Sequence, residues 1–90
     1  MALARLKKNY FVYILKCQDG TFYTGVTTDV PRRFQEHKAG KGGHYTRAHP
    51  PKSVARIERG FTHGDALRRE AQIKKLSRAK KLAMIRELGV

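Results

Sequence analysis

Two tyrosines near the start of the chain flank a tight turn and could share one chemical task. Tyr13 and Tyr23 stand on either side of Asp19-Gly20, and an Asp-Gly pair between apolar runs is a strong signal for a β-hairpin. A hairpin places the two phenols on neighbouring strands, where they can share one face. They could be core aromatics. Beside cationic groups, a phenol can instead accept a proton from water.

An arginine and a histidine follow the tyrosines at helical spacing. Arg33 and His37 are four residues apart, so a helix would carry them on one stripe. A guanidinium in that place can hold a phosphate in its planar fork and stabilise the charge that develops on it. The other interpretation is an ordinary surface arginine, and the neighbouring Arg32 leaves that choice open at this point.

Glu70 is the acidic residue that could bind a metal ion. In a predicted helix it falls on or beside the apolar stripe of Ala66 and Ile73, where an unpaired carboxylate costs free energy. A salt bridge to one of the many arginines would satisfy it. A hard cation is the alternative, because Mg²⁺ often takes one or two carboxylates and completes its shell with waters and phosphate oxygens.

The charge of the chain indicates a polyanionic partner. Twenty Lys and Arg against seven Asp and Glu give a net charge of +13 in 90 residues. Such a surface attracts polyanions, and nucleic acid is the first candidate. A basic ribosome-associated protein would carry the same charge without catalysis. The residues expected to contact nucleic acid are Lys41, Tyr45, Arg47, Arg69 and Lys74, with Tyr45 able to stack on a base.

Composition disfavours several other classes of protein. The longest apolar run, Tyr10 to Leu15, is far shorter than the roughly 20 residues that span a bilayer. The start of the chain offers no apolar segment long enough for a secretory signal. The single Cys17 excludes an intrachain disulfide and fits a reducing compartment. We therefore expect a cytoplasmic protein without membrane association, and the scattered His residues do not match a zinc site.

A small α/β fold would position these side chains. Ninety residues predict one domain, 1–90, with a small core. We expect a three-stranded sheet with an N-terminal antiparallel hairpin, flanked by three helices. The predicted strands are 10–17, 21–26 and 52–61, and the third carries Val54, Ile57 and Phe61 as its apolar members.

The predicted helices follow from capping residues and apolar spacing. The first begins after Asp29, contains Pro31 in its first turn and runs to about residue 39. The second covers 64–76, and Ser77 caps the third, whose inner stripe is Leu82, Ile85 and Leu88. The composition of residues 40–51 predicts a loop.

These residues together resemble the GIY-YIG nuclease superfamily. "FVY" at 11–13 and "YTG" at 23–25 resemble the two triads that name it, and the likeness continues through Thr27, Asp29-Val30, Arg33 and His37. Glu70, within "ALRREAQIKKL", stands at the place of the family's metal-binding glutamate. The resemblance covers nearly the whole chain and is greatest to small stand-alone bacterial members. Phe11 and Val12 depart from the first triad and Thr24 departs from the second.

The resemblance implies a divalent-metal-dependent endonuclease that hydrolyses phosphodiester bonds, with DNA as the expected partner. One Mg²⁺ or Mn²⁺ would be held by Glu70. Tyr13 or Tyr23 would position or deprotonate the attacking water, and Arg33 would contact the scissile phosphate. DNA structure or a partner protein would supply the choice of target. A non-catalytic nucleic-acid-binding module on the same scaffold is the alternative.

The resemblance also gives roles to two supporting residues. His37 would assist Arg33 or order the water and the phosphate. Gly25 lies in the interior of a predicted strand, where glycine usually marks a bulge or the close approach of another group, and in the family it would let backbone or substrate come near.

Overall fold

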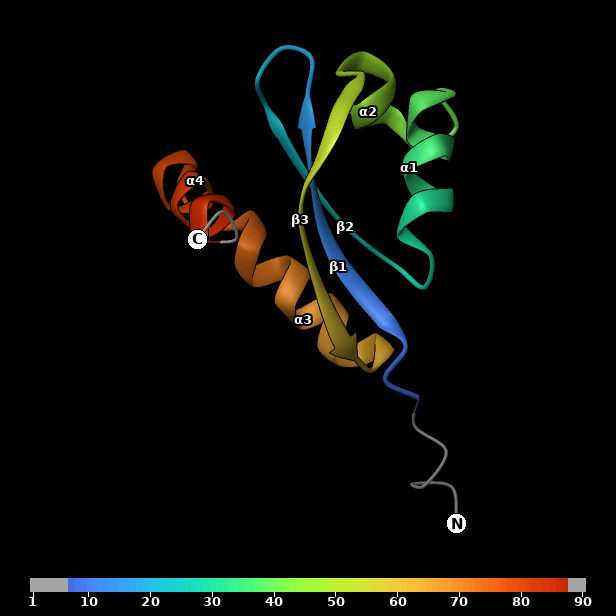
Figure 1. The fold of residues 1–90 in the computed structure, drawn as a ribbon, viewed down its shortest axis with the longest axis vertical. Coiled ribbons are helices and arrows are strands. Elements are labelled where there is room, and N and C mark those ends of the chain that lie inside the picture. The colour runs from blue at the N-terminus through green and yellow to red at the C-terminus, as the bar shows by residue number, and fades with distance from the viewer. Residues whose placement is uncertain (1–6, 88–90) are drawn as a thin grey trace.

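The structure is a computed structural model that describes residues 7–87. Three strands, β1 (Tyr10–Cys17), β2 (Phe22–Thr27) and β3 (Pro51–Phe61), form one antiparallel sheet in the order β2-β1-β3. The helices α1 (Val30–Lys38) and α2 (His44–Ala48) lie on one side of this sheet, and α3 (His63–Lys74) and α4 (Arg78–Glu87) lie on the other (Figure 1). The predicted α/β fold with an N-terminal hairpin is confirmed.

The short helix α2 corrects the prediction of a continuous loop over residues 40–51. Gly43 precedes it with a positive φ of 123°, and the His49 N–H donates to the Tyr45 carbonyl at its end. The loop was predicted because glycines and prolines at the two ends of residues 40–51 dominate the composition of that stretch. The five residues between them contain no helix breaker, and burial of Thr46 anchors the turn that they form.

The register of the hairpin brings the two tyrosines to one face of the sheet. Tyr13 pairs with Gly25, and Leu15 pairs with Tyr23. Because side chains alternate between the faces of a strand, Tyr13, Tyr23 and Gly25 all belong to the same face. Gly20 closes the hairpin turn with a φ of 85°, a conformation that glycine adopts without steric cost.

β1 is apolar on both faces because it separates two hydrophobic clusters. Tyr13 and Leu15 pack with Val30 on the α1 side. Val12 and Ile14 pack with residues of α3 on the opposite side. The central strand is therefore buried on both faces, which agrees with its run of apolar residues.

Capping side chains set where three of the helices begin. Asp29 accepts a hydrogen bond from the Arg32 N–H at the start of α1. Thr62 accepts from the Asp65 N–H at 3.2 Å at the start of α3, and the Ser77 hydroxyl accepts from the Lys80 N–H at the start of α4. Such caps satisfy backbone donors that have no partner within the helix.

Two expectations about apolar residues change in the structure. Ile57 on the outer strand β3 is 37% exposed, because it lines an open groove between β3 and the start of α1 rather than the core. On α4, Ile85 packs against the core together with Met84, a residue that the predicted stripe did not include. Leu82 is half-buried, and Leu88 lies outside the described residues.

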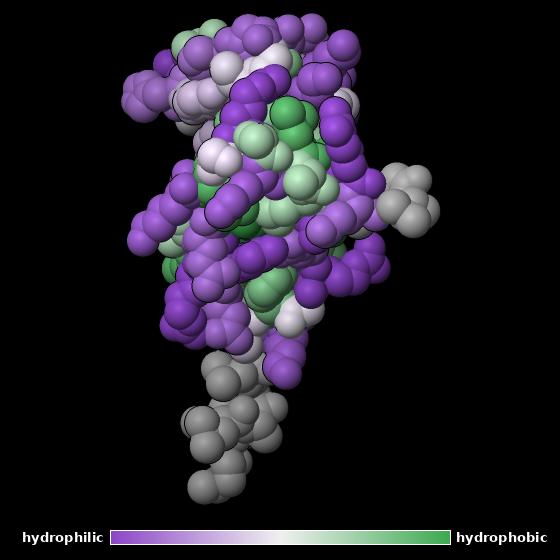
Figure 2. Space-filling view, turned by 90° about the vertical axis from the view of Figure 1, so that its left-hand side faces the viewer, coloured by the Kyte–Doolittle hydropathy of each residue, from purple (hydrophilic) through white to green (hydrophobic). Residues whose placement is uncertain are grey.

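The outer surface is largely hydrophilic. On the face formed by α3 and α4, hydrophilic residues surround a smaller hydrophobic area (Figure 2). Within residues 7–87, the helices are all too short or too polar to cross a membrane.

Candidate active site

A buried chain of hydrogen bonds links β1, α1 and α2. The Tyr13 hydroxyl lies 2.9 Å from His37 Nε2, and His37 Nδ1 lies 2.6 Å from Thr46 Oγ1. The three residues are 1%, 1% and 2% exposed. One strand and two helices thus meet at one imidazole, although the residues that they contribute are far apart in the sequence.

Two glycines make room for these rings. A Cβ atom at Gly25 would lie 2.5 Å from Tyr13 Cζ, and one at Gly42 would lie 2.6 Å from both Cγ and Cε1 of His37. The expected close approach at Gly25 is therefore the approach of the Tyr13 ring. The sequence analysis missed Gly42 and Thr46. The only signal for them is the glycine-rich "GKGG" segment, whose composition predicts a loop and not a contact with His37.

Burial determines the protonation of both rings. It raises the pKa of Tyr13 to about 12, and nearby Tyr23 contributes to the increase while the Arg33 guanidinium opposes it. Burial also lowers the pKa of His37, and the positive charge of Arg33 lowers it further. At neutral pH the phenol is therefore protonated and the imidazole is neutral. Arg33 thus acts on Tyr13 in the direction expected of a cationic neighbour, but the effect of burial is larger.

Tyr23 is half-buried and joins the cluster from β2. Its ring centroid lies 5.1 Å from that of His37 in an edge-on arrangement and 6.4 Å from that of Tyr13. Tyr23 also stacks with Tyr45 of α2, with 5.7 Å between the ring centroids, and Tyr45 in turn stacks with His49 at a centroid distance of 4.3 Å. Tyr45 is 38% exposed, so the aromatic cluster continues from the buried site to the surface.

The structure separates the two neighbouring arginines. The Arg33 guanidinium faces the cluster, where it donates to Glu36 at 2.8 Å and to the Gly42 carbonyl at 3.2 Å and lowers the pKa of Tyr13. Arg32 points outward, with its side chain 57% exposed and paired with Asp29 and Glu36. Arg33 is therefore the arginine placed to act with Tyr13.

Glu70 approaches the cluster from α3. Its negative charge contributes to the raised pKa of Tyr13, and its carboxylate lies 3.2 Å from Lys74 Nζ. The ion pair that satisfies Glu70 is thus with lysine and not with arginine. Lys74 Nζ also lies 6.0 Å from the Tyr23 ring centroid, which places this pair beside the aromatic cluster.

The donor set around Glu70 fits a single hard cation. Within residues 7–87, no three His, Cys, Asp or Glu side chains lie close enough together to form a metal site by themselves. One half-buried carboxylate at the surface matches the manner in which Mg²⁺ is held by few protein ligands, several waters and a substrate phosphate. A self-sufficient protein cage is not required for that ion.

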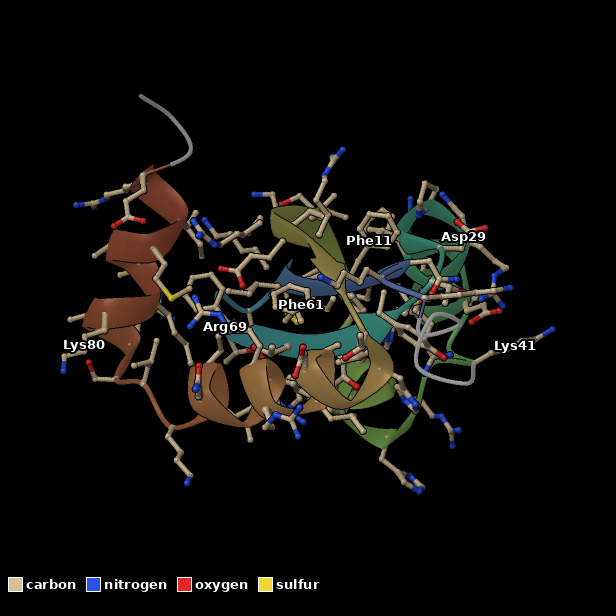
Figure 3. The ribbon with its side chains drawn as sticks, turned by 90° about the horizontal axis from the view of Figure 1, so that it is seen from below. Phe11, Asp29, Lys41, Phe61, Arg69 and Lys80 are labelled. Carbon is tan, nitrogen blue, oxygen red and sulfur yellow. The ribbon has the colours of Figure 1, made fainter. Side chains whose placement is uncertain are left out.

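Of the five residues expected to contact nucleic acid, Arg69 does not join the site. It makes two hydrogen bonds with Glu58 of β3, at 2.7 and 2.9 Å, and Glu58 also pairs with Arg56 at 2.9 Å. Figure 3 places Arg69 on the α3 side of the molecule and Lys41 on the α1 side. Lys41 and Arg47 are exposed and adjoin Gly42 and Thr46 in the chain, and Lys74 is 52% exposed.

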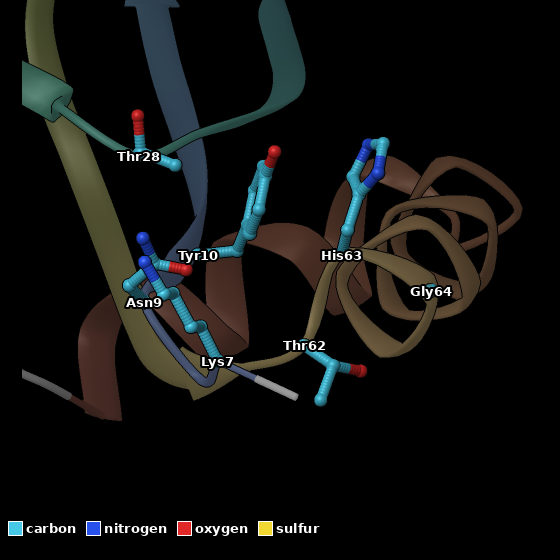
Figure 4. Close-up of a pocket in the computed structure, with 7 residues that line it drawn as sticks. All are labelled: Lys7, Asn9, Tyr10, Thr28, Thr62, His63 and Gly64. Atoms are coloured by element: carbon cyan, nitrogen blue, oxygen red, sulfur yellow. The ribbon is translucent and has the colours of Figure 1, made fainter. Parts of the chain in front are cut away.

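A pocket elsewhere on the described chain lies away from this cluster. It has a volume of about 510 Å³ and is formed by the start of β1, by Thr28 and by the first turn of α3 (Figure 4). The tyrosine cluster instead reaches the surface through the half-buried Tyr23 and the exposed Tyr45, which suits a substrate much larger than the protein's small core could enclose.

Two tyrosines, an arginine, a histidine and a glutamate thus lie near one another in a three-stranded α/β domain. The GIY-YIG catalytic domain family matches residues 9–83. The chain belongs to this family, which is a family of nucleases.

Relatives of similar length extend the assignment. A UPF0213 protein of Halobacterium salinarum is 49% identical over 75 residues, which are 83% of this chain and 97% of that protein. A UPF0213 protein of Syntrophus aciditrophicus is 47% identical over 83 residues, which are 91% of this chain and 94% of that protein. The predicted resemblance to small stand-alone members of the family is confirmed.

Two solution NMR structures share the fold. The protein EF2693 from E. faecalis is 38% identical, with a TM-score of 0.60 over 92% of this chain and 88% of that chain. The UPF0213 protein BH0048 from Bacillus halodurans is 43% identical, with a TM-score of 0.54 over 84% of this chain and 81% of that chain.

Proposed function

We propose that this protein is a divalent-metal-dependent endonuclease that hydrolyses phosphodiester bonds in DNA. The observation that carries the proposal is the convergence of Tyr13, Arg33 and His37 on one face of the sheet, with Glu70 beside them. The match to the family of GIY-YIG catalytic domains supports it.

Arg33 would bind the scissile phosphate. The Arg33 side chain is 32% exposed and shares its donors between Glu36 and the Gly42 carbonyl, so its guanidinium can turn toward a phosphate without a change of fold. Stabilising the charge that develops on the phosphate oxygens in the transition state is worth about 2.7–4 kcal/mol for one well-placed donor.

Tyr13 and His37 would remove the proton of the attacking water together. A free phenolate is costly at Tyr13, because burial raises its pKa to about 12. The phenol can avoid that state by taking the water proton on its oxygen while it passes its own proton to His37 Nε2, 2.9 Å away. The water oxygen then bonds to phosphorus as the bond to the leaving oxygen breaks. Tyr23, which is half-buried, would orient the water.

Glu70 would hold one Mg²⁺ or Mn²⁺ ion. When bound, that ion supplies positive charge to the phosphate and to the leaving oxygen. Lys74 now neutralises the carboxylate, and a cation would replace it in that role. The Lys74 ammonium would then be released toward the phosphate backbone.

The charge distribution favours a nucleic acid held along the surface of the site. Lys41, Arg47 and Lys74 are exposed around the tyrosine cluster, and the whole chain carries a net charge of +13. Binding of this kind weakens steeply with salt, with a log–log slope of about −0.9 per phosphate neutralised. The choice of target would come from DNA structure or from a partner protein. We propose a cytoplasmic location for the protein.

The test uses labelled branched, nicked and single-stranded DNA with Mg²⁺ or Mn²⁺. Arg33→Ala is expected to reduce cleavage roughly 100- to 1,000-fold, whereas the matched control Arg32→Ala should cut at nearly the wild-type rate. Wild-type protein that binds all of these substrates and cuts none would instead support a non-catalytic nucleic-acid-binding module.

A further inference from the structure

We propose that Thr46 is a positioning residue for the nuclease reaction: its hydroxyl holds His37 in the tautomer that carries the ring proton on Nδ1. The Nε2 atom is then left free to receive the proton of Tyr13. The proposal rests on the function proposed above for the catalytic step, but the tautomer can be measured without any cleavage assay.

The contacts around the Tyr13 oxygen indicate which tautomer of His37 is present. Arg33 lies beside this oxygen, and a guanidinium has only donors to offer. The Tyr13 proton must therefore point to another acceptor, and His37 Nε2 lies 2.9 Å away. A neutral imidazole carries one ring proton, so that proton is on Nδ1, where Thr46 Oγ1 accepts it at 2.6 Å.

The surroundings of Thr46 fix its hydroxyl in this place. Thr46 is 2% exposed, and a β-branched side chain has restricted χ1 freedom. The preceding segment is held against the same ring, since Gly42 packs on His37 and its carbonyl accepts a hydrogen bond from Arg33. The segment from Gly42 to Thr46 thus closes over His37 and makes Thr46 Oγ1 the hydrogen-bond partner of His37 Nδ1.

The other tautomer would block the proposed proton transfer. With its proton on Nε2, His37 would present a donor to Tyr13 and could not accept the phenol proton. Thr46 would act on the reaction through the histidine and not through the substrate, because its hydroxyl is already bonded to His37 Nδ1. Its loss should therefore reduce kcat and leave DNA affinity unchanged.

The first experiment reads the His37 ring nitrogens by ¹⁵N NMR at neutral pH, with neither metal nor DNA present. Wild-type protein and Thr46→Ser should show a protonated Nδ1 and a bare Nε2. Thr46→Val, which removes the hydroxyl at nearly constant volume, should show a mixture of the two tautomers, because Nδ1 loses its acceptor while Tyr13 remains beside Nε2; an unchanged Nδ1 proton would overturn the proposal. Wild-type protein with its proton on Nε2 would overturn the proposal.

A second variant keeps the proposal testable if Thr46→Val does not fold. Tyr13→Phe removes the other partner of the imidazole and leaves Thr46 intact. If Thr46 fixes the tautomer, the Nδ1 proton persists in Tyr13→Phe. If the proton moves to Nε2 in this variant, Tyr13 and not Thr46 sets the tautomer, and the proposal is wrong.

Kinetics then test the consequence for catalysis. Under saturating DNA, Thr46→Val should lose roughly 10- to 100-fold in kcat with an unchanged KM, and Thr46→Ser should recover most of the loss. A wild-type kcat in Thr46→Val would contradict the positioning role. If the wild-type protein cuts no DNA, the proposed function fails and the NMR result alone decides the assignment of the tautomer.

Discussion

The Tyr13 hydroxyl and the His37 Nε2 atom lie 2.9 Å apart, and both side chains are almost completely buried. β1 supplies the phenol and α1 supplies the imidazole, so the pair exists only when the helix is docked on the sheet. This relationship gives a tyrosine with a pKa of about 12 an acceptor for its proton. It is the reason why we assign the proton transfer to Tyr13.

Replacing Tyr13 with Phe should abolish most cleavage and preserve the fold. The ring remains and only the hydroxyl is lost, so the free energy of unfolding should fall by only about 1 kcal/mol. Cleavage should fall roughly 100- to 10,000-fold, which is the usual contribution of general acid–base catalysis. Single-turnover cleavage measures the effect, with Tyr10→Phe as control because Tyr10 lies outside the cluster. Wild-type cleavage by Tyr13→Phe would assign the base to another group.

The pH dependence of cleavage should reflect a neutral His37. Burial and the charge of Arg33 lower the pKa of this imidazole, while Glu36 opposes them. The acid limb of kcat/KM should therefore lie below the ordinary histidine pKa of about 6.5, because the active neutral form persists to lower pH. A profile measured from pH 5 to 9 would contradict the assignment if its acid limb lay above that value and were unchanged in His37→Gln.

Gly42 should tolerate no side chain. A Cβ atom there would lie 2.6 Å from ring atoms of His37, and overpacking of this kind costs about 1–3 kcal/mol. Gly42→Ala should therefore lower the urea midpoint and also slow cleavage, since the displaced ring is part of the site. Gly64→Ala is the control, because a Cβ atom at that glycine would meet only the far end of Arg68, at 3.7 Å. Equal stability of the two variants would contradict the close approach.

The ion-pair cluster on the α3 side should contribute to stability and not to cleavage. Arg69, with a smaller contribution from Arg56, lowers the pKa of Glu58 against the opposing effect of burial. A carboxyl whose folded pKa is depressed stabilises the fold at neutral pH and loses this contribution as the pH falls below about 4.3. Glu58→Gln should therefore cost about 1–3 kcal/mol at pH 7, and this difference should shrink in acid.

Urea unfolding at pH 7 and at pH 3 measures this difference, with the exposed Glu87→Gln as a control. A constant difference between wild type and Glu58→Gln at both pH values would show that the charge of Glu58 is not the cause. Cleavage and DNA binding by Glu58→Gln should match those of wild type, because Arg69 lies outside the tyrosine cluster.

Local patterns were sufficient to predict the parts of the site that lie on regular elements. The Asp-Gly turn and the two-residue alternation of strands placed Tyr13 and Tyr23 together, and four-residue spacing placed Arg33 with His37. Thr46 and Gly42 could not be found in this way, because their contacts with His37 form only when the loop folds back over α1. Ile57 is an apolar residue, so its type alone predicts burial. It is exposed because β3 lies at the edge of the sheet, and the order of the strands is not encoded in the local pattern.

The central claim is that this cluster is a metal-dependent nuclease site, and single-turnover DNA cleavage by Glu70→Gln tests it most directly. At equal DNA occupancy, wild type and the Glu87→Gln control should cut with Mg²⁺ or Mn²⁺ and stop when a chelator is added. Glu70→Gln should bind DNA but cut about 1,000-fold more slowly, corresponding to a loss of several kcal/mol of transition-state stabilisation. Cleavage by Glu70→Gln at the wild-type rate would contradict the claim.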